Sequence, residues 1–237
     1  MTQDQNIQTS SRKRIWNRVK KILLYLVIGQ FAYLLICKWI NPPITITQAV
    51  NLVEGNGLRR DYIDYEDMGR NIKLAVMASE DQLFPDHDGF DIRAIKKAIK
   101  YNNKHPNKTR GASTISQQTA KNIFLWQHGG FFRKGLEVYF TFMIELLWSK
   151  ERILENYLNV AEMGKGIFGV QAAAKAYFNK DAMNLSRKEA AMIAACLPNP
   201  KKLTVKPACR YVTSRASRIM VQMNNLEGDP DIEALLK

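Results

Sequence analysis

The chain of 237 residues carries a formal net charge of +13 and contains three cysteines, Cys37, Cys196 and Cys209. This length suffices for one sizeable domain with an appendage, while so few cysteines exclude a disulfide framework, and no metal-ligand spacing is present. Residues 1–40 contain seven Lys or Arg and one acid, so +6 belongs to them and +7 to the remainder. A body this basic indicates an anionic partner (nucleic acid, phospholipid headgroups or a phosphorylated substrate), although simple solubility explains it equally well.

The N-terminal region is typical of a membrane anchor. Residues 1–11 are polar and predicted to be disordered, residues 12–21 are basic, and an uncharged apolar run begins at Ile22. Residues 22–40 are long enough to span a bilayer as one helix, with Lys38 snorkelling and Trp39 at the interface. No small residues follow the run to form a cleavage site, so we predict an uncleaved anchor and neither a signal peptide nor a lipoprotein. The preceding basic flank places the N-terminus in the cytoplasm and the body outside.

The remainder of the chain is predicted to be mostly α. Asn41-Pro42-Pro43 ends the first helix, residues 44–50 are interpreted as a short extended piece, and residues 102–109 as a mobile loop. No convincing sheet is present, and the glycines between 164 and 169 are interpreted as a loop. Four divisions follow: a basic tail (1–21), an anchor (22–40), a linker (41–64) and a catalytic domain (65–237). Apolar spacing and capping residues predict its helices over residues 65–79, 91–101, 113–122, 132–148, 150–158, 170–178, 186–197 and 210–226.

Segment 78–91 places one carboxyl group where an apolar helix meets a polar loop. Glu80 lies at this junction, where partial burial can raise the pKa of a carboxyl group toward neutrality. Glu80 is therefore our candidate for a catalytic acid or base. We expect His87 to be structural, with its neighbours Asp86 and Asp88 as partners. The loop's shape is attributed to Asp81, His87 and Asp91.

The segment 111–122, GASTISQQTAKN, combines a predicted helix with a polar face. Either Ser113 or Thr114 can cap this helix. Hydroxyl, amide and ammonium groups in one row can bind a sugar that carries a phosphate, although a solvated polar face has the same composition. The predicted row consists of Ser113, Gln117 and Lys121, with Thr114 and Gln118 beside it.

Two further clusters follow. Phe124-Leu125-Trp126 and Phe131-Phe132 flank a Gly-Gly turn, and this cluster either packs in the core or enters the surface of the bilayer. Arg133 and Glu137 lie four residues apart with Lys134 beside them. They form either a helix-stabilising ion pair, worth about 0.2–0.5 kcal/mol, or a phosphate clamp beside a second carboxylate.

Two carboxylates with a cation cluster suit the transfer of a sugar from a phosphate leaving group. One glutamate would accept the proton of the attacking hydroxyl, while the cations would balance the charge of the departing pyrophosphate. Glycoside hydrolases also use paired carboxylates, but they need no cation cluster because their leaving group is not a phosphate.

Four motifs in this order resemble those of the peptidoglycan glycosyltransferases of family 51, in particular the monofunctional biosynthetic transglycosylases. The resemblance covers residues 65–200, and the N-terminal anchor also fits. The motifs are Glu80-Asp81-x-x-Phe84-x-x-His87-x-Gly89-Phe90-Asp91, Gly111-x-Ser113-Thr114-Ile115-x-Gln117-Gln118-x-x-Lys121-Asn122, Arg133-Lys134-x-x-Glu137 and Lys150-x-x-Ile153-Leu154-Glu155-x-Tyr157-Leu158-Asn159.

The resemblance implies a lysozyme-like α-helical fold with a small lobe that contacts the membrane. It implies inverting polymerisation of lipid II into β-1,4-linked glycan strands, with release of undecaprenyl pyrophosphate. Glu80 would be the general base on the acceptor 4-hydroxyl, and Glu137 would be the second catalytic carboxylate, serving the donor pyrophosphate. The implied substrate-binding residues are Ser113, Gln117, Gln118, Lys121, Asn122, Arg133 and Lys134.

The implied partners are lipid II, the growing glycan strand and membrane lipid rather than nucleic acid, with cell-wall synthesis proteins as candidates for recruitment through the anchor. Family members of this kind can use a divalent cation, but no cofactor is expected to be required and no motif argues for a metal independently. The chain ends at Lys237 and its one S-x-x-K, Ser10 to Lys13, precedes the anchor, so we expect no transpeptidase activity.

Two other functions share some of these features. A lysozyme-like enzyme that cleaves glycan would use the same fold class and a single glutamate, but the cations at Lys121, Arg133 and Lys134 argue against it. A non-catalytic, membrane-anchored scaffold would bind lipid II without turning it over.

Overall fold

The computed structural model describes residues 3–106 and 110–237, and it divides into two compact units, residues 1–40 and 41–237. Residues 1–2 of the predicted disordered tail and 107–109 of the predicted mobile loop lie outside the described residues. The first unit is one helix, α1 (Gln3–Cys37). The prediction of disorder was therefore wrong for residues 3–11; these residues include no Pro or Gly, so nothing stops the helix from propagating toward the N-terminus.

Helix α1 contains the described chain's one candidate membrane span, Lys13–Cys37, which is long and apolar enough to cross a bilayer. This confirms the predicted apolar helix, which fits a membrane anchor. The helix ends at Cys37, so Lys38 to Ile40 follow it as turn and bend residues instead of extending it.

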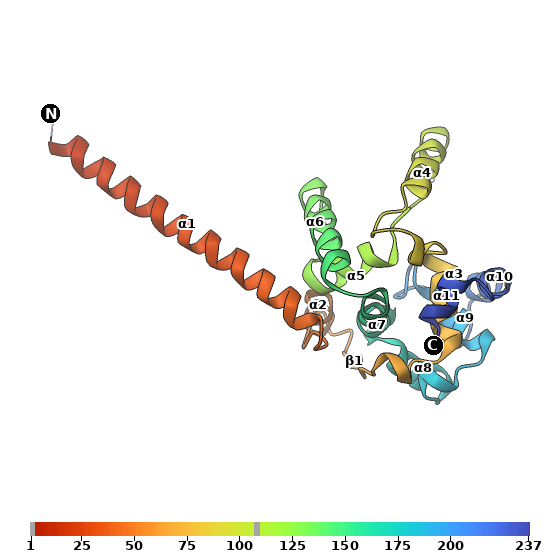
Figure 1. Ribbon diagram of the computed structural model, residues 1–237. Helices are drawn as coiled ribbons and strands as arrows, with labels where there is room; N and C mark the ends of the chain where they lie inside the picture. The colour runs from red at the N-terminus through yellow and green to blue at the C-terminus, as the bar shows by residue number, and fades with distance from the viewer. Residues whose placement is uncertain (1–2, 107–109) are drawn as a thin grey trace. The chain divides into compact units, whose positions relative to one another are not determined.

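The second unit is mostly helical, as predicted (Figure 1). Helix α3 packs against α9 and α10, while α5 packs against α6 and α7, so the unit has two helical clusters. The helices of this unit are α2 (Ile46–Val53), α3 (Arg70–Glu80), α4 (Ile92–Lys104), α5 (Ile115–Phe124), α6 (Phe131–Leu147), α7 (Lys150–Val160), α8 (Val170–Phe178), α9 (Arg187–Cys196), α10 (Arg210–Leu226) and α11 (Pro230–Leu235), with short 3₁₀ turns η1 (Tyr65–Asp67), η2 (Phe84–Asp86) and η3 (Ala182–Asn184).

Capping side chains account for where several helices begin. Thr114 and Ser186 form capping boxes with Gln117 and Glu189 at the starts of α5 and α9, and both caps were candidates in the sequence. Thr45 does the same for α2, so residues 46–50 are helical and the expected extended piece was wrong. The alternation of Ile and Thr suggested a strand, but the capping box selects a helix.

A small sheet joins part of the predicted linker (41–64) to the segment around the predicted glycine loop (164–169). Its strands are β1 (Arg59–Arg60), β2 (Glu162–Gly164) and β3 (Ile167–Phe168), in the order β1-β3-β2. Strand β3 pairs in parallel with β1 and antiparallel with β2, with Arg59 opposite Ile167. These strands of two or three residues are too short to show an alternating pattern, which explains why the sequence did not reveal them.

Candidate active site

Glu80 is the last residue of α3, and the helix beneath it is firmly held. Ile72 and residues 74–78 are buried against the neighbouring helices, so the helix end has a fixed position. Asp81 follows the helix as its C-cap, and its carboxylate accepts the backbone N–H of Ile115, at the start of α5, at 2.9 Å. The Glu80 side chain is 13% exposed, which agrees with the half-buried position predicted for it.

Three side chains hold the Glu80 carboxylate. Ser79 and Arg215 donate to Oε1 at 3.0 and 3.3 Å, and Gln118 Nε2 donates to Oε2 at 3.0 Å. Tyr157 in turn donates its hydroxyl to Gln118 Oε1 at 3.2 Å. Burial raises the pKa of Tyr157 well above its ordinary value, so this hydroxyl stays protonated and orients Gln118. Oε1 accepts two of these hydrogen bonds and Oε2 accepts one, so a lone pair of Oε2 can still accept a proton from a substrate.

Asp81 fixes the loop after Glu80, as we predicted when we attributed the shape of the loop to it. His87 Nε2 lies 3.0 Å from Asp81 Oδ1, and the Gly89 N–H donates to His87 Nδ1 at 3.1 Å. The partner is therefore Asp81, and the expectation that Asp86 and Asp88 would satisfy His87 was wrong, because the turn at η2 directs the ring back toward the end of α3. Burial alone would lower the pKa of His87, but the hydrogen bond and charge of Asp81 outweigh it and the pKa is raised.

Gly89 is required by both conformation and space. Its φ is +85°, and a Cβ there would lie 2.7 Å from Thr141 Cγ2 and 2.9 Å from Glu145 Cγ on α6. Asp91 accepts the Ala94 N–H at 2.8 Å and caps α4, which also supports the interpretation that it holds the loop's shape.

The predicted polar row on α5 is only partly formed. The helix begins at Ile115, so Ser113 precedes it, and Gln117 is buried with its Oε1 accepting the Thr114 N–H at 3.1 Å. Gln117 therefore caps the helix. Lys121 is further along α5, where burial lowers its pKa, and within the described part of the chain its ammonium makes no hydrogen bond or ion pair.

The third cluster surrounds a buried carboxylate on α6. Glu137 is 3% exposed and forms ion pairs with Arg133, at 2.7 Å, and with Lys134. The buried Nε of Arg133 has no hydrogen-bond partner within the described residues. Burial is the main cause of the lowered pKa of Lys121, and the charges of Glu137 and Glu80 act in the opposite direction and raise it.

Two cavities meet at Lys121. The larger, which we call the Glu80 cavity, has a volume of about 1000 Å³ and is lined by Glu80, Ser113 and the cations Arg93, Lys97, Arg110 and Arg215. The smaller, the Asn122 cavity, has about 480 Å³ and is lined by Asn122, Trp126, Glu162 and Lys201. Their linings share Gln118, Lys121, Leu197 and Pro198. Among the described residues, Gln117, Arg133, Lys134 and Glu137 line neither cavity.

The family model described as Transglycosylase matches residues 47–224. The chain belongs to the transglycosylase family. It is 49% identical over 217 residues to a biosynthetic peptidoglycan transglycosylase from Pseudomonas entomophila (strain L48), covering 89% of this chain and 92% of the relative. Proteins of the same name from Pseudomonas syringae pv. tomato and Aeromonas hydrophila are 44% and 42% identical over 227 and 221 residues, covering 93% and 90% of this chain and 96% and 92% of those proteins. The predicted family is thereby confirmed.

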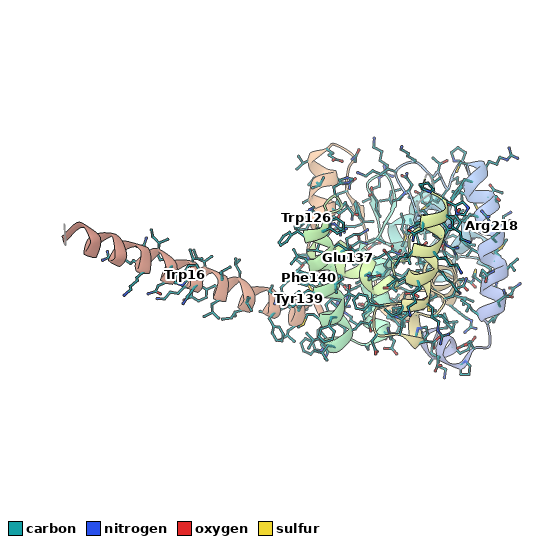
Figure 2. All side chains as sticks on the ribbon, turned by 90° about the horizontal axis from the view of Figure 1, so that it is seen from above. Trp16, Trp126, Glu137, Tyr139, Phe140 and Arg218 are labelled. Atoms are coloured by element: carbon teal, nitrogen blue, oxygen red, sulfur yellow. The ribbon has the colours of Figure 1, made fainter. Side chains whose placement is uncertain are left out.

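In this transglycosylase the aromatic cluster is divided between core and surface. Phe124 stacks on Phe140 with ring centroids 4.7 Å apart, and Leu125 is buried, as the core interpretation predicted. Trp126 is 40% exposed, and Phe131 and Phe132 at the start of α6 are 97% and 76% exposed. Figure 2 shows Trp126, Phe140 and Glu137 in the region of the transglycosylase formed by α5 and α6.

Three residues of the Glu80 environment, Ser79, Tyr157 and Arg215, were not among the predicted site residues, and Ser79 directly precedes Glu80 in the sequence. Tyr157 belongs to the fourth motif, so its place in the sequence was a usable signal. Arg215 is one of several basic residues on the surface of α10 and lies beyond the residues that resembled the family, so no sequence signal distinguished it.

Proposed function

We propose that the protein polymerises lipid II into β-1,4-linked glycan strands, with inversion and release of undecaprenyl pyrophosphate. The names of the relatives supply the peptidoglycan substrate. The observation that carries the proposal is the Glu80 carboxylate, held by three donors in a cationic cavity that shares Lys121 with a second cavity. A sugar acceptor and a phosphate-activated sugar donor need such adjoining sites.

The acceptor is assigned to the Glu80 cavity, because its 4-hydroxyl must reach the Glu80 carboxylate. Glu80 accepts the hydroxyl proton as the oxygen attacks the anomeric carbon of the donor sugar, and inversion follows from attack on the face opposite the leaving pyrophosphate. Gln118 and Ser113 lie on the lining of this cavity and are assigned to binding the sugar.

The donor is assigned to the Asn122 cavity, so that its pyrophosphate lies at the shared wall beside Lys121. An unpaired ammonium held in a partly buried position is well suited to a phosphate, because binding satisfies both the charge and the hydrogen-bond donors. Arg133 and Lys134 add positive potential behind Lys121. Glu137 holds these two cations in place, so we assign it to support of the donor site rather than to contact with reacting atoms.

The cluster of Arg133, Lys134 and Glu137 does not fit a divalent cation. Mg²⁺ is bound by oxygen ligands, whereas the carboxylate of this cluster, Glu137, is already paired with two cations. Within the described residues, no group of three or more His, Cys, Asp or Glu side chains could hold a metal. The cations of the chain itself are therefore assigned to balancing the charge of the pyrophosphate.

Helix α1 is proposed to anchor the protein in the cytoplasmic membrane, with the basic tail (1–21) in the cytoplasm and residues 41–237 outside. Residues 41–64 lie between the anchor (22–40) and the catalytic domain (65–237) in the chain, and their helix α2 and strand β1 pack with the second unit. The anchor is also the segment through which cell-wall synthesis proteins would be recruited. Lipid II is embedded in the same membrane, so an anchored enzyme meets its substrate there.

A polymerisation assay with purified protein and lipid II tests the proposal. Wild type should produce glycan strands that are visible on a gel, and Glu80→Gln should lower the rate by at least about 100-fold, because an amide cannot accept the proton. The melting temperature of Glu80→Gln should stay near that of wild type. Substantial polymerisation by this variant would refute the role of Glu80. Release of soluble muropeptides from sacculi without polymer would instead indicate a glycan-cleaving enzyme.

A further inference from the structure

Arg215 reaches the catalytic carboxylate from a distant part of the chain. It lies on α10, which is fixed because Val212, Ala216 and Ile219 pack in the core beside α3 and α9. The Arg215 side chain is 26% exposed and lines the Glu80 cavity. It therefore brings a positive charge to Glu80 from a segment 135 residues away in sequence.

Arg215 is one of the hydrogen-bond donors that hold the two oxygens of the Glu80 carboxylate. Its Nη2 donates to Ser79 Oγ at 3.1 Å and to Glu80 Oε1 at 3.3 Å, while Gln118 holds Oε2 at 3.0 Å from the opposite side. Donors from α3, α5 and α10 thus constrain both carboxylate oxygens. Within the described part of the chain, Arg215 forms its ion pair with Glu80. The buried Nε of Arg215 has no hydrogen-bond partner among these residues.

We propose that Arg215 is a positioning residue that fixes the orientation of the Glu80 carboxylate for proton abstraction. This inference rests on the proposed role of Glu80 as the base. A glutamate side chain at a helix end can adopt several rotamers, and a misplacement of about 1 Å can cost on the order of 100-fold in rate.

A set of three variants tests the assignment in the full-length protein with lipid II as substrate. Arg215→Gln should lower kcat by about 10- to 100-fold and change KM less than about threefold, because the lost contact acts on the base. Arg215→Lys should recover part of kcat, since an ammonium retains the charge. Arg218→Gln is the matched control: Arg218 is exposed, lies on the same helix and is labelled in Figure 2, and it should retain kcat within about twofold.

A double variant separates positioning from other roles. If Arg215 acts through Glu80, adding Arg215→Gln to Glu80→Gln should lower the residual rate no further. A further additive loss, an increase in KM at unchanged kcat, or a kcat equal to that of Arg218→Gln would each overturn the inference. If wild type itself made no polymer, the proposed function would fail instead, so the two failures are distinguishable.

Discussion

At the scale of single residues, the site depends on charges that are placed before substrate arrives. Lys121 is unpaired in the described chain, whereas Arg133 and Lys134 are tied to Glu137. A buried ion pair is costly to form and contributes little net stability, so its presence beside an unpaired lysine argues for a functional reason. The sequence identified these residues through their motifs, but it could not show that Glu137 and its partners lie behind the cavities and not on their walls.

Arg133→Ala distinguishes the two interpretations of this cluster. If Arg133 serves the donor pyrophosphate, polymerisation should fall by at least about tenfold, while stability falls by about 1–3 kcal/mol because Lys134 still pairs with Glu137. The matched control is Arg152→Ala, which removes Arg152 from an ion pair with Glu155 that has a similar exposure and lies on neither cavity wall. Kinetic and chemical-denaturation measurements check both variants. Equal losses of stability with unchanged turnover in both would leave Arg133 with only an ion-pair role.

At the scale of elements, apolar spacing explains which helices could be predicted from the sequence. The bounds of α8 and α10 match the predicted ranges, 170–178 and 210–226, because apolar spacing defines them along their whole length. The interaction of the Glu80 loop with α5 could not be predicted, because Asp81 and the Ile115 N–H are 34 residues apart and only the fold brings them together. The same applies to Arg215 and Glu80.

The pair of His87 and Asp81 predicts a pH-dependent stability. The pKa of His87 is raised above 6.5, its ordinary value, so the pair contributes fully below about pH 6.5 and its contribution is lost as the pH rises through the folded-state pKa. His87→Gln should therefore destabilise the protein more at about pH 5.5 than at about pH 8.5. Urea unfolding of both proteins across this range measures the difference. A destabilisation that is the same at both pH values would show that the charge of His87 contributes nothing.

At the scale of the whole molecule, the body of the protein has an apolar surface of its own. One face of α6 carries exposed apolar side chains at helical spacing: Phe131, Val138, Phe142 and Leu146. Exposed apolar faces of this kind indicate contact with another surface. In a protein with a candidate membrane anchor and a proposed lipid-linked substrate, the surface that fits is a lipid bilayer.

This membrane contact predicts that residues 41–237 bind vesicles without α1. We expect this fragment, which forms a compact unit by itself, to co-sediment with phosphatidylcholine vesicles. Replacing both Phe131 and Phe132 by Ser should lower the partition coefficient at least about tenfold, because full burial of one Phe side chain is worth about 1.5–3 kcal/mol. Val221→Ser, which changes an exposed apolar residue on α10, is the control and should leave partitioning unchanged. Equal binding by all three proteins would assign the exposed phenylalanines a role other than membrane contact.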